Sequence, residues 1–152
     1  MADVSLVSVF FVWVVGFGLL SVLLRGRVSR LLLWSRLPRI VNYYILLTPL
    51  VLIEESLTCE SPYFSCITLT LPAFYFLFLL LYLMQSRLRM GHVKTAMIFG
   101  VIGWFDEFIL VGRLFHLPFV IVLIVTPLTI AIYAVLAILP SYYLEQEIKR
   151  RA

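Results

Sequence analysis

The chain has 152 residues, of which 63% are hydrophobic and 13% are charged. A soluble globular domain is usually about half apolar and about a quarter charged, so this composition indicates an integral membrane protein with one polytopic domain over residues 1–152. The net charge of +4 is divided among short clusters between apolar runs, which is a pattern of membrane topology and argues against a nucleic-acid partner.

Five apolar segments follow one another along the chain, and their lengths fit helices that cross a lipid bilayer. They lack the strict alternation of apolar and polar residues that marks the strands of a membrane barrel. We therefore expect an all-α membrane protein with five transmembrane helices. The predicted spans are residues 4–24, 40–57, 67–84, 95–112 and 117–139.

The segment between the first two predicted spans, residues 25–39, contains five arginines around the apolar run Leu-Leu-Leu-Trp at residues 31–34. Arginines that flank an apolar patch with a tryptophan are typical of an amphipathic helix lying at the membrane interface. We expect such a helix here. The alternative is a solvated loop whose charges only set the topology.

Basic residues set the predicted orientation, because short cytoplasmic loops carry an excess of Lys and Arg. Eleven of the twelve basic residues fall in segments 25–39, 87–94 and 149–151, which share one side of a five-span chain; only Arg113 falls on the other side. We therefore expect a multi-pass protein of the cell membrane with its N-terminus outside and its C-terminus in the cytoplasm. His92 is expected only to add to the basic cytoplasmic surface.

Two pairs of adjacent acidic residues interrupt the apolar segments. Asp106 and Glu107 follow eleven residues of the fourth span, which as a helix cover roughly 16 Å of a hydrocarbon core roughly 30 Å thick. Glu54 and Glu55 follow fourteen residues of the second span and so lie nearer its outer boundary. Because a charge in hydrocarbon is costly, such residues predict a functional site. The alternative for Glu54 and Glu55 is contact with outer headgroups and water.

We expect one acid of each pair to converge between the second and fourth spans, which run in the same direction. Two carboxyl groups held close together do not both ionise readily. They therefore suit a site that shares a proton or binds a hard cation through oxygen ligands. Arg113, two turns after Asp106, and His116 in the outer loop complete the set of ion- or substrate-binding candidates, although a lone His is more often an ordinary loop residue.

The second and third predicted spans resemble the fourth and fifth in their order of features. Each pair of spans has adjacent acids in the outer half of its first helix and a Thr and a Pro in its second helix. The two acidic pairs are 52 residues apart. We expect a duplicated two-helix hairpin preceded by one extra helix. The two hairpins would be related by a pseudo-axis along the membrane normal. The alternative is that any two membrane hairpins look alike.

Both cysteines, Cys59 and Cys66, lie around the short outer loop after the second predicted span. The predicted topology places them on the oxidising side of the membrane, so we expect a structural disulfide between them. Free thiols or a redox pair are the alternatives, although the spacing differs from the Cys-x-x-Cys motif of thiol oxidoreductases.

The acidic motifs are compared with two families of membrane enzymes. Asp106, Glu107 and Arg113 resemble the Glu-Glu-x-x-x-Arg motif of CAAX-type intramembrane proteases, but the arginine comes two residues too late and the later His motifs are absent. Phe105 and Asp106, with Pro49 and the two glutamates, resemble the acidic motifs of small membrane lycopene cyclase domains, with different spacings. No family is assigned, although the second resemblance implies acid–base chemistry on a lipid-soluble substrate.

Three functions are compatible with these observations. The first is transport or conduction of a cation or proton at the paired carboxyls, in a homo-oligomer, because five helices barely surround a path. The second is a membrane enzyme that uses carboxyl acid–base chemistry on a lipid or isoprenoid. The third is an accessory subunit of a membrane complex. No cofactor is evident, metal ligands are unknown, and a bound cation fits the acids.

Overall fold

The computed structural model describes residues 10–58, 63–110 and 118–151, and the regular structure in these ranges is entirely helical. The described part of the chain begins with a π-helix, η1, and ends with a long helix, α6. The elements in order are η1 (Phe10–Phe17), α2 (Gly18–Leu33), α3 (Arg39–Thr58), α4 (Tyr63–Leu88), α5 (His92–Phe105), η2 (Asp106–Leu110) and α6 (Phe119–Arg151).

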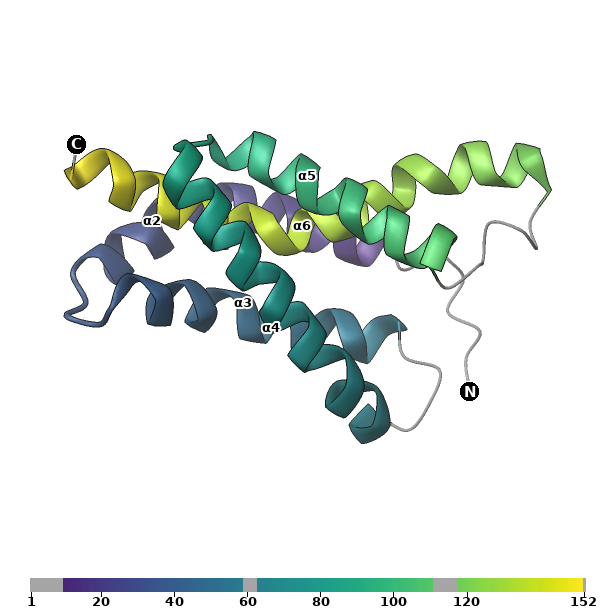
Figure 1. Ribbon diagram of the computed structural model, residues 1–152, viewed down its shortest axis with the longest axis horizontal. Helices are drawn as coiled ribbons and strands as arrows, with labels where there is room; N and C mark the ends of the chain where they lie inside the picture. The colour runs from purple at the N-terminus through teal and green to yellow at the C-terminus, as the bar shows by residue number, and fades with distance from the viewer. Residues whose placement is uncertain (1–9, 59–62, 111–117, 152) are drawn as a thin grey trace.

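Helix α6 is the central element of the bundle. In Figure 1 it runs along the long axis of the molecule with α5 beside it, while α3 lies below it and α4 crosses obliquely from below it to the turn that leads into α5. It contacts η1, α2, α3, α4 and α5, and its closest neighbour is α5. Every other α-helix of the described chain therefore packs against α6.

Three of the described helices are long and apolar enough to cross a membrane, namely Phe11–Leu33, Leu71–Leu88 and Phe119–Arg151. These helices are compatible with the predicted membrane location. Helix α3 carries Arg39, Glu54 and Glu55, and α5 has only 14 residues before the chain enters η2. Five spans, their orientation and the duplicated hairpin stay predictions.

Two helices extend well beyond the predicted spans. The first was expected to end at Leu24, but it continues through the arginines to Leu33 without a break, so residues 25–33 are not a separate interfacial helix. The last was expected to end at Leu139, but α6 continues through Pro140 to Arg151. Apolar residues mark the depth of the hydrocarbon, whereas Leu, Arg, Lys and Glu all sustain a helix beyond it.

The core lies where η1, α3, α4 and α5 meet α6, and its largest members are aromatic. Trp13 is fully buried, and its indole Nε1 donates a hydrogen bond of 3.0 Å to the carbonyl oxygen of Ile132. The rings of Phe78 and Phe99 pack with their centroids 4.3 Å apart. The indole bond fastens η1 to α6, since a buried indole N–H requires an acceptor.

Two glycines allow α5 to approach α6 closely. A Cβ at Gly100 would lie 2.5 Å from the carbonyl oxygen of Ile130, and a Cβ at Gly103 would overlap the ring of Tyr133. Small residues permit close backbone contact between membrane helices, where packing rather than water exclusion drives association. The contact between α5 and α6 therefore depends on the absence of a side chain at these two positions.

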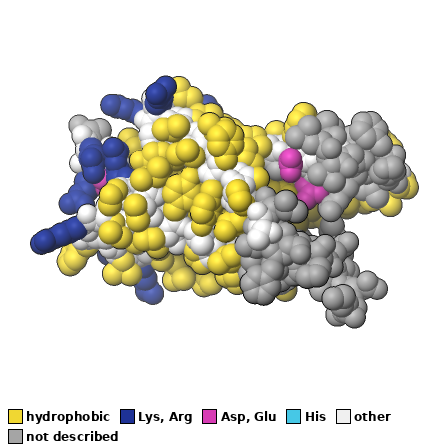
Figure 2. Space-filling view, turned by 60° about the horizontal axis from the view of Figure 1, so that its bottom comes forward, with side chains coloured by type: hydrophobic (Ala, Val, Ile, Leu, Met, Phe, Trp, Pro, Cys, Tyr) yellow, Lys and Arg dark blue, Asp and Glu magenta, His cyan; other side chains and the backbone are white. Residues whose placement is uncertain are grey.

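The charged side chains are separated along the long axis of the molecule. Figure 2 shows the described Lys and Arg side chains gathered toward one end, and acidic side chains exposed toward the other. The basic end unites the turn between α2 and α3, the turn between α4 and α5, and the C-terminal turns of α6. This separation is compatible with the predicted orientation.

We expect Gly100→Ala to lower the free energy of unfolding by about 1–3 kcal/mol, because the new methyl meets a backbone oxygen that cannot turn aside. Thermal unfolding of the purified protein in detergent micelles measures the effect. The matched control is Gly26→Ala in α2, where a Cβ would meet nothing within 4 Å. Equal melting temperatures for the two variants would contradict the close contact of α5 and α6.

Candidate functional site

The four predicted acids lie near the ends of α3 and α5. Glu54 and Glu55 are close to the end of α3, with exposed fractions of only 5% and 7%. Asp106 and Glu107 are the first two residues of η2; Asp106 is exposed and Glu107 is half-buried. Three of the four acids are thus at least partly withdrawn from the surface.

The second acidic pair coincides with a change of helix type. The α-helical pattern of α5 ends at Phe105, and Asp106 opens the single π-helical turn of η2. The backbone N–H of Asp106 is shared between the carbonyl oxygens of Ile102 and Gly103. Single π turns are rare and occur frequently at functional sites. The local backbone therefore agrees with the unusual chemistry of the side chains in marking this position.

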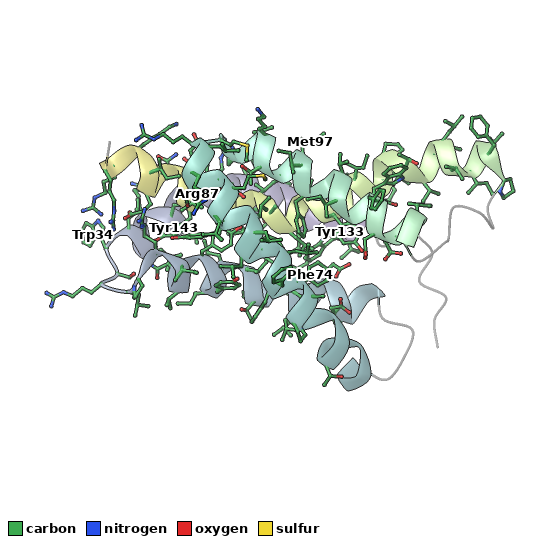
Figure 3. The ribbon with its side chains drawn as sticks, viewed as in Figure 1. Trp34, Phe74, Arg87, Met97, Tyr133 and Tyr143 are labelled. Atoms are coloured by element: carbon green, nitrogen blue, oxygen red, sulfur yellow. The ribbon has the colours of Figure 1, made fainter. Side chains whose placement is uncertain are left out.

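Tyr133 of α6 joins the acids of α3 and η2. Its hydroxyl donates a hydrogen bond of 3.0 Å to Oε1 of Glu107. Glu54 and Asp106 also lie within electrostatic range of the same hydroxyl. The hydroxyl of Tyr133 is thus bonded to a carboxyl of η2 and lies within electrostatic range of a carboxyl of α3. Figure 3 shows Tyr133 near Phe74 of α4.

The ring of Tyr133 is held by its neighbours on three sides. Gly103 of α5 leaves room for one face of the ring. Phe74 of α4 stacks with it at a centroid distance of 6.3 Å, and Phe99 of α5 meets it edge-on at 6.2 Å. The hydroxyl is therefore aimed at Glu107 by packing, and does not depend on the hydrogen bond alone.

Sequence reasoning did not single out Tyr133. The signal that points to it is chemical: a tyrosine inside a predicted span carries a hydroxyl that needs a hydrogen-bond partner when it is buried. The sequence of α6 does not show which way Tyr133 points, because the first half of this helix is apolar on nearly every side. The hydrogen-bond partner of Tyr133 becomes apparent only in the folded structure, where Gly103 and Glu107 lie beside it.

Several predicted site residues lie outside the described part of the chain. Arg113, His116 and Cys59 belong to this group, and the side chain of Cys66 does as well. Their roles and the disulfide stay predictions. Within residues 10–58, 63–110 and 118–151, no group of three His, Cys, Asp or Glu side chains is placed to hold a metal ion.

A second polar cluster lies at the basic end, around His92, which sequence reasoning had assigned only to the surface. Oε2 of Glu145 accepts hydrogen bonds of 2.6 Å from both the backbone N–H and the ring Nδ1 of His92. The ring Nε2 lies 3.0 Å from a guanidinium nitrogen of Arg25. Because arginine only donates, this contact assigns the acceptor role to Nε2 and the donor role toward Glu145 to Nδ1.

This cluster ties α2, α5 and α6 together. The guanidinium of Arg25 also lies over the ring of Tyr142, 5.0 Å from its centroid, and Lys149 pairs with the other oxygen of Glu145. Burial raises the pKa of Glu145, but the hydrogen bonds from Lys149 and His92 outweigh burial and lower the pKa to about 2. The anion is thus favoured by its partners.

Comparison with known proteins does not add evidence on function. No protein-family model, no curated protein and no solved structure matches this chain. A functional conclusion therefore rests on the side chains described above.

We expect Tyr133→Phe to lower the free energy of unfolding by about 1 kcal/mol, because the hydrogen bond to Glu107 is lost while the ring remains. Chemical denaturation in detergent micelles measures the change. Tyr142→Phe is the matched control, since no hydrogen bond of its hydroxyl is seen within the described residues. A loss of the same size in both variants would contradict a specific bond to Glu107.

We expect the stability of the protein to fall as the pH is lowered from about 4.5 toward 2. The pKa of Glu145 in the folded protein, about 2, lies below its ordinary value of 4.5. Its ionised form therefore contributes stability above the ordinary value, and this contribution is lost as the pH falls through the folded pKa. Melting temperatures measured across this range should depend less steeply on pH in Glu145→Gln; identical profiles would refute the assignment.

Proposed function

We propose that the protein binds a proton or a cation at the carboxyls of Glu54 and Glu107 and uses this site in transport or conduction across the membrane. The observation that carries the proposal is the hydroxyl of Tyr133, which bonds Glu107 and lies within electrostatic range of Glu54. Three elements, α3, η2 and α6, each supply one of these groups.

The chemistry of these groups suits protons and hard cations. Carboxyl and phenol oxygens are ligands for hard cations, and a carboxyl hydrogen-bonded to a hydroxyl can gain or release a proton without a large rearrangement. A charge in a buried setting is expensive, so a buried carboxyl is stabilised by a proton or by a positive partner. Glu54, at 5% exposure, is in such a setting.

The packing of the bundle limits where a path for protons or cations could run. Trp13, Phe78 and Phe99 fill the interior beside α6, with exposed fractions of 0–1%. Asp106, by contrast, is exposed at the mouth of the site. A path for ions would therefore pass along the outside of the bundle beside Asp106, which supports a homo-oligomer in which neighbouring copies complete its wall.

The proposal is tested by flux into liposomes. Purified protein is reconstituted in vesicles that contain a pH-sensitive dye, and a pH gradient or a cation gradient with a membrane potential is imposed. We expect Glu107→Gln and Glu54→Gln each to lower the protein-dependent flux at least about tenfold, because each removes one ionisable oxygen ligand.

Glu147→Gln is the matched control for this experiment. It makes the same chemical change at a carboxyl of α6 that is equally buried, 7% exposed, but lies at the basic end. Flux in this variant should equal that of the wild type. Wild-type vesicles that conduct no better than empty ones, or site variants that conduct normally, would refute the transport function.

A further inference from the structure

The basic end of the molecule contains a cavity of about 800 Å³. It lies between the end of α2, the turn that leads into α3 and the C-terminal turns of α6. Its charged lining consists of four arginines and one glutamate: Arg36, Arg39, Arg150, Arg151 and Glu147. The lining therefore carries an excess of positive charge.

The floor of this cavity is polar and rigid. Asn42 and Tyr143, each 1% exposed, line it. The amide Nδ2 of Asn42 lies 3.0 Å from the hydroxyl of Tyr143, 2.7 Å from the hydroxyl of Ser35 and 3.2 Å from the carbonyl oxygen of Leu32, so its two N–H groups are shared among three acceptors. One buried amide thus joins α2, α3 and α6, so the cavity has a preformed shape.

The arginines around the cavity are only partly neutralised. Arg151 donates to Oε1 of Glu147 at 2.7 Å, and Arg150 donates to the carbonyl oxygen of Leu33 at 2.9 Å. Among the described residues, neither Arg36 nor Arg39 forms an ion pair. Guanidinium groups match the geometry of phosphate oxygens, and their charge strengthens the hydrogen bonds they make to an anion.

Apolar side chains at the mouth place the cavity at the level of lipid headgroups. The indole of Trp34 is 89% exposed and lies at the same end of the molecule as Tyr143 (Figure 3). Leu31 and Leu37 beside it are also exposed. Tryptophan prefers the membrane–water interface, and basic pockets between membrane helices at this depth suit anionic headgroups.

We propose that this cavity binds a phosphate group, presented by the headgroup of an anionic phospholipid in the adjoining leaflet. Arg36 and Arg39 provide the charge for the phosphate, while Asn42 and Tyr143 form the floor beneath it. A free phosphate ion offers the same chemistry, but the exposed Trp34 and the neighbouring leucines favour a molecule whose acyl chains extend along the helices.

The test measures how ligands raise the melting temperature of the purified full-length protein in detergent, from which an apparent Kd is obtained. The probes are short-chain phosphatidylglycerol, short-chain phosphatidylcholine and inorganic phosphate. We expect phosphatidylglycerol to stabilise the protein saturably and Arg36→Gln with Arg39→Gln to raise its apparent Kd at least about tenfold. The matched control removes the same charge outside the cavity, with Arg27→Gln and Arg87→Gln, and should stay close to the wild type.

A second variant distinguishes a loss of binding from a loss of folding. Glu147→Gln removes the one negative charge of the lining and releases Arg151. We expect it to bind phosphatidylglycerol about two- to threefold more tightly, a gain that a misfolded protein cannot show. Unchanged or weaker binding in Glu147→Gln overturns the proposal.

The remaining outcomes separate the two sources of phosphate from a general charge effect. Saturation by inorganic phosphate that competes with phosphatidylglycerol supports the site and identifies a free phosphate. Binding of phosphatidylglycerol without a response to inorganic phosphate supports the lipid headgroup. Equal weakening by the two double variants, no weakening by either, equal stabilisation by phosphatidylcholine, or no response to phosphatidylglycerol and phosphate overturns the proposal.

Discussion

The close contact of α5 with α6 at Gly100 and Gly103 is the constraint on which the rest of the structure depends. It brings the backbone of α5 against Ile130 and leaves space for the ring of Tyr133. Only this approach allows one hydroxyl of α6 to meet Glu107 immediately after α5 ends. Since η1, α2, α3 and α4 also contact α6, the position of this pair of helices determines where the other elements pack.

The apolar runs in the sequence predicted where helices lie, and the acidic pairs predicted where the candidate site begins. The ends of helices were not predictable in this way, because hydropathy reports depth in the bilayer and not the end of a hydrogen-bonding pattern. Leu24 and Leu139 are examples, each followed by further helical turns. Tyr133 and Asn42 gain their importance from partners on other helices, which a single segment does not reveal.

The two polar regions of the molecule differ in how their groups are satisfied. At the basic end, Glu145 has His92 and Lys149 as partners, and Asn42 uses one amide to bond three neighbours. These groups are compensated within the bundle, as expected of interactions that stabilise a fold. At the acidic end, Asp106 is exposed in the π turn, Glu54 is buried near the end of α3, and Glu107 accepts a hydrogen bond from Tyr133 of α6. The acidic end thus combines an exposed carboxyl with one that is bonded to the central helix.

Because α6 is long, these two regions would be in different solvents in a membrane. Its 33 residues extend roughly 50 Å, whereas a hydrocarbon core is roughly 30 Å thick. In a membrane, one continuous helix of this length would carry Tyr133 within the nonpolar layer and its last turns into the layer of headgroups and ions. Dissolved salt would screen the charges of the last turns but would have little access to the hydrogen bond between Tyr133 and Glu107. Ionic strength thus offers a physical means of acting on one end of a single helix while leaving the other end unchanged.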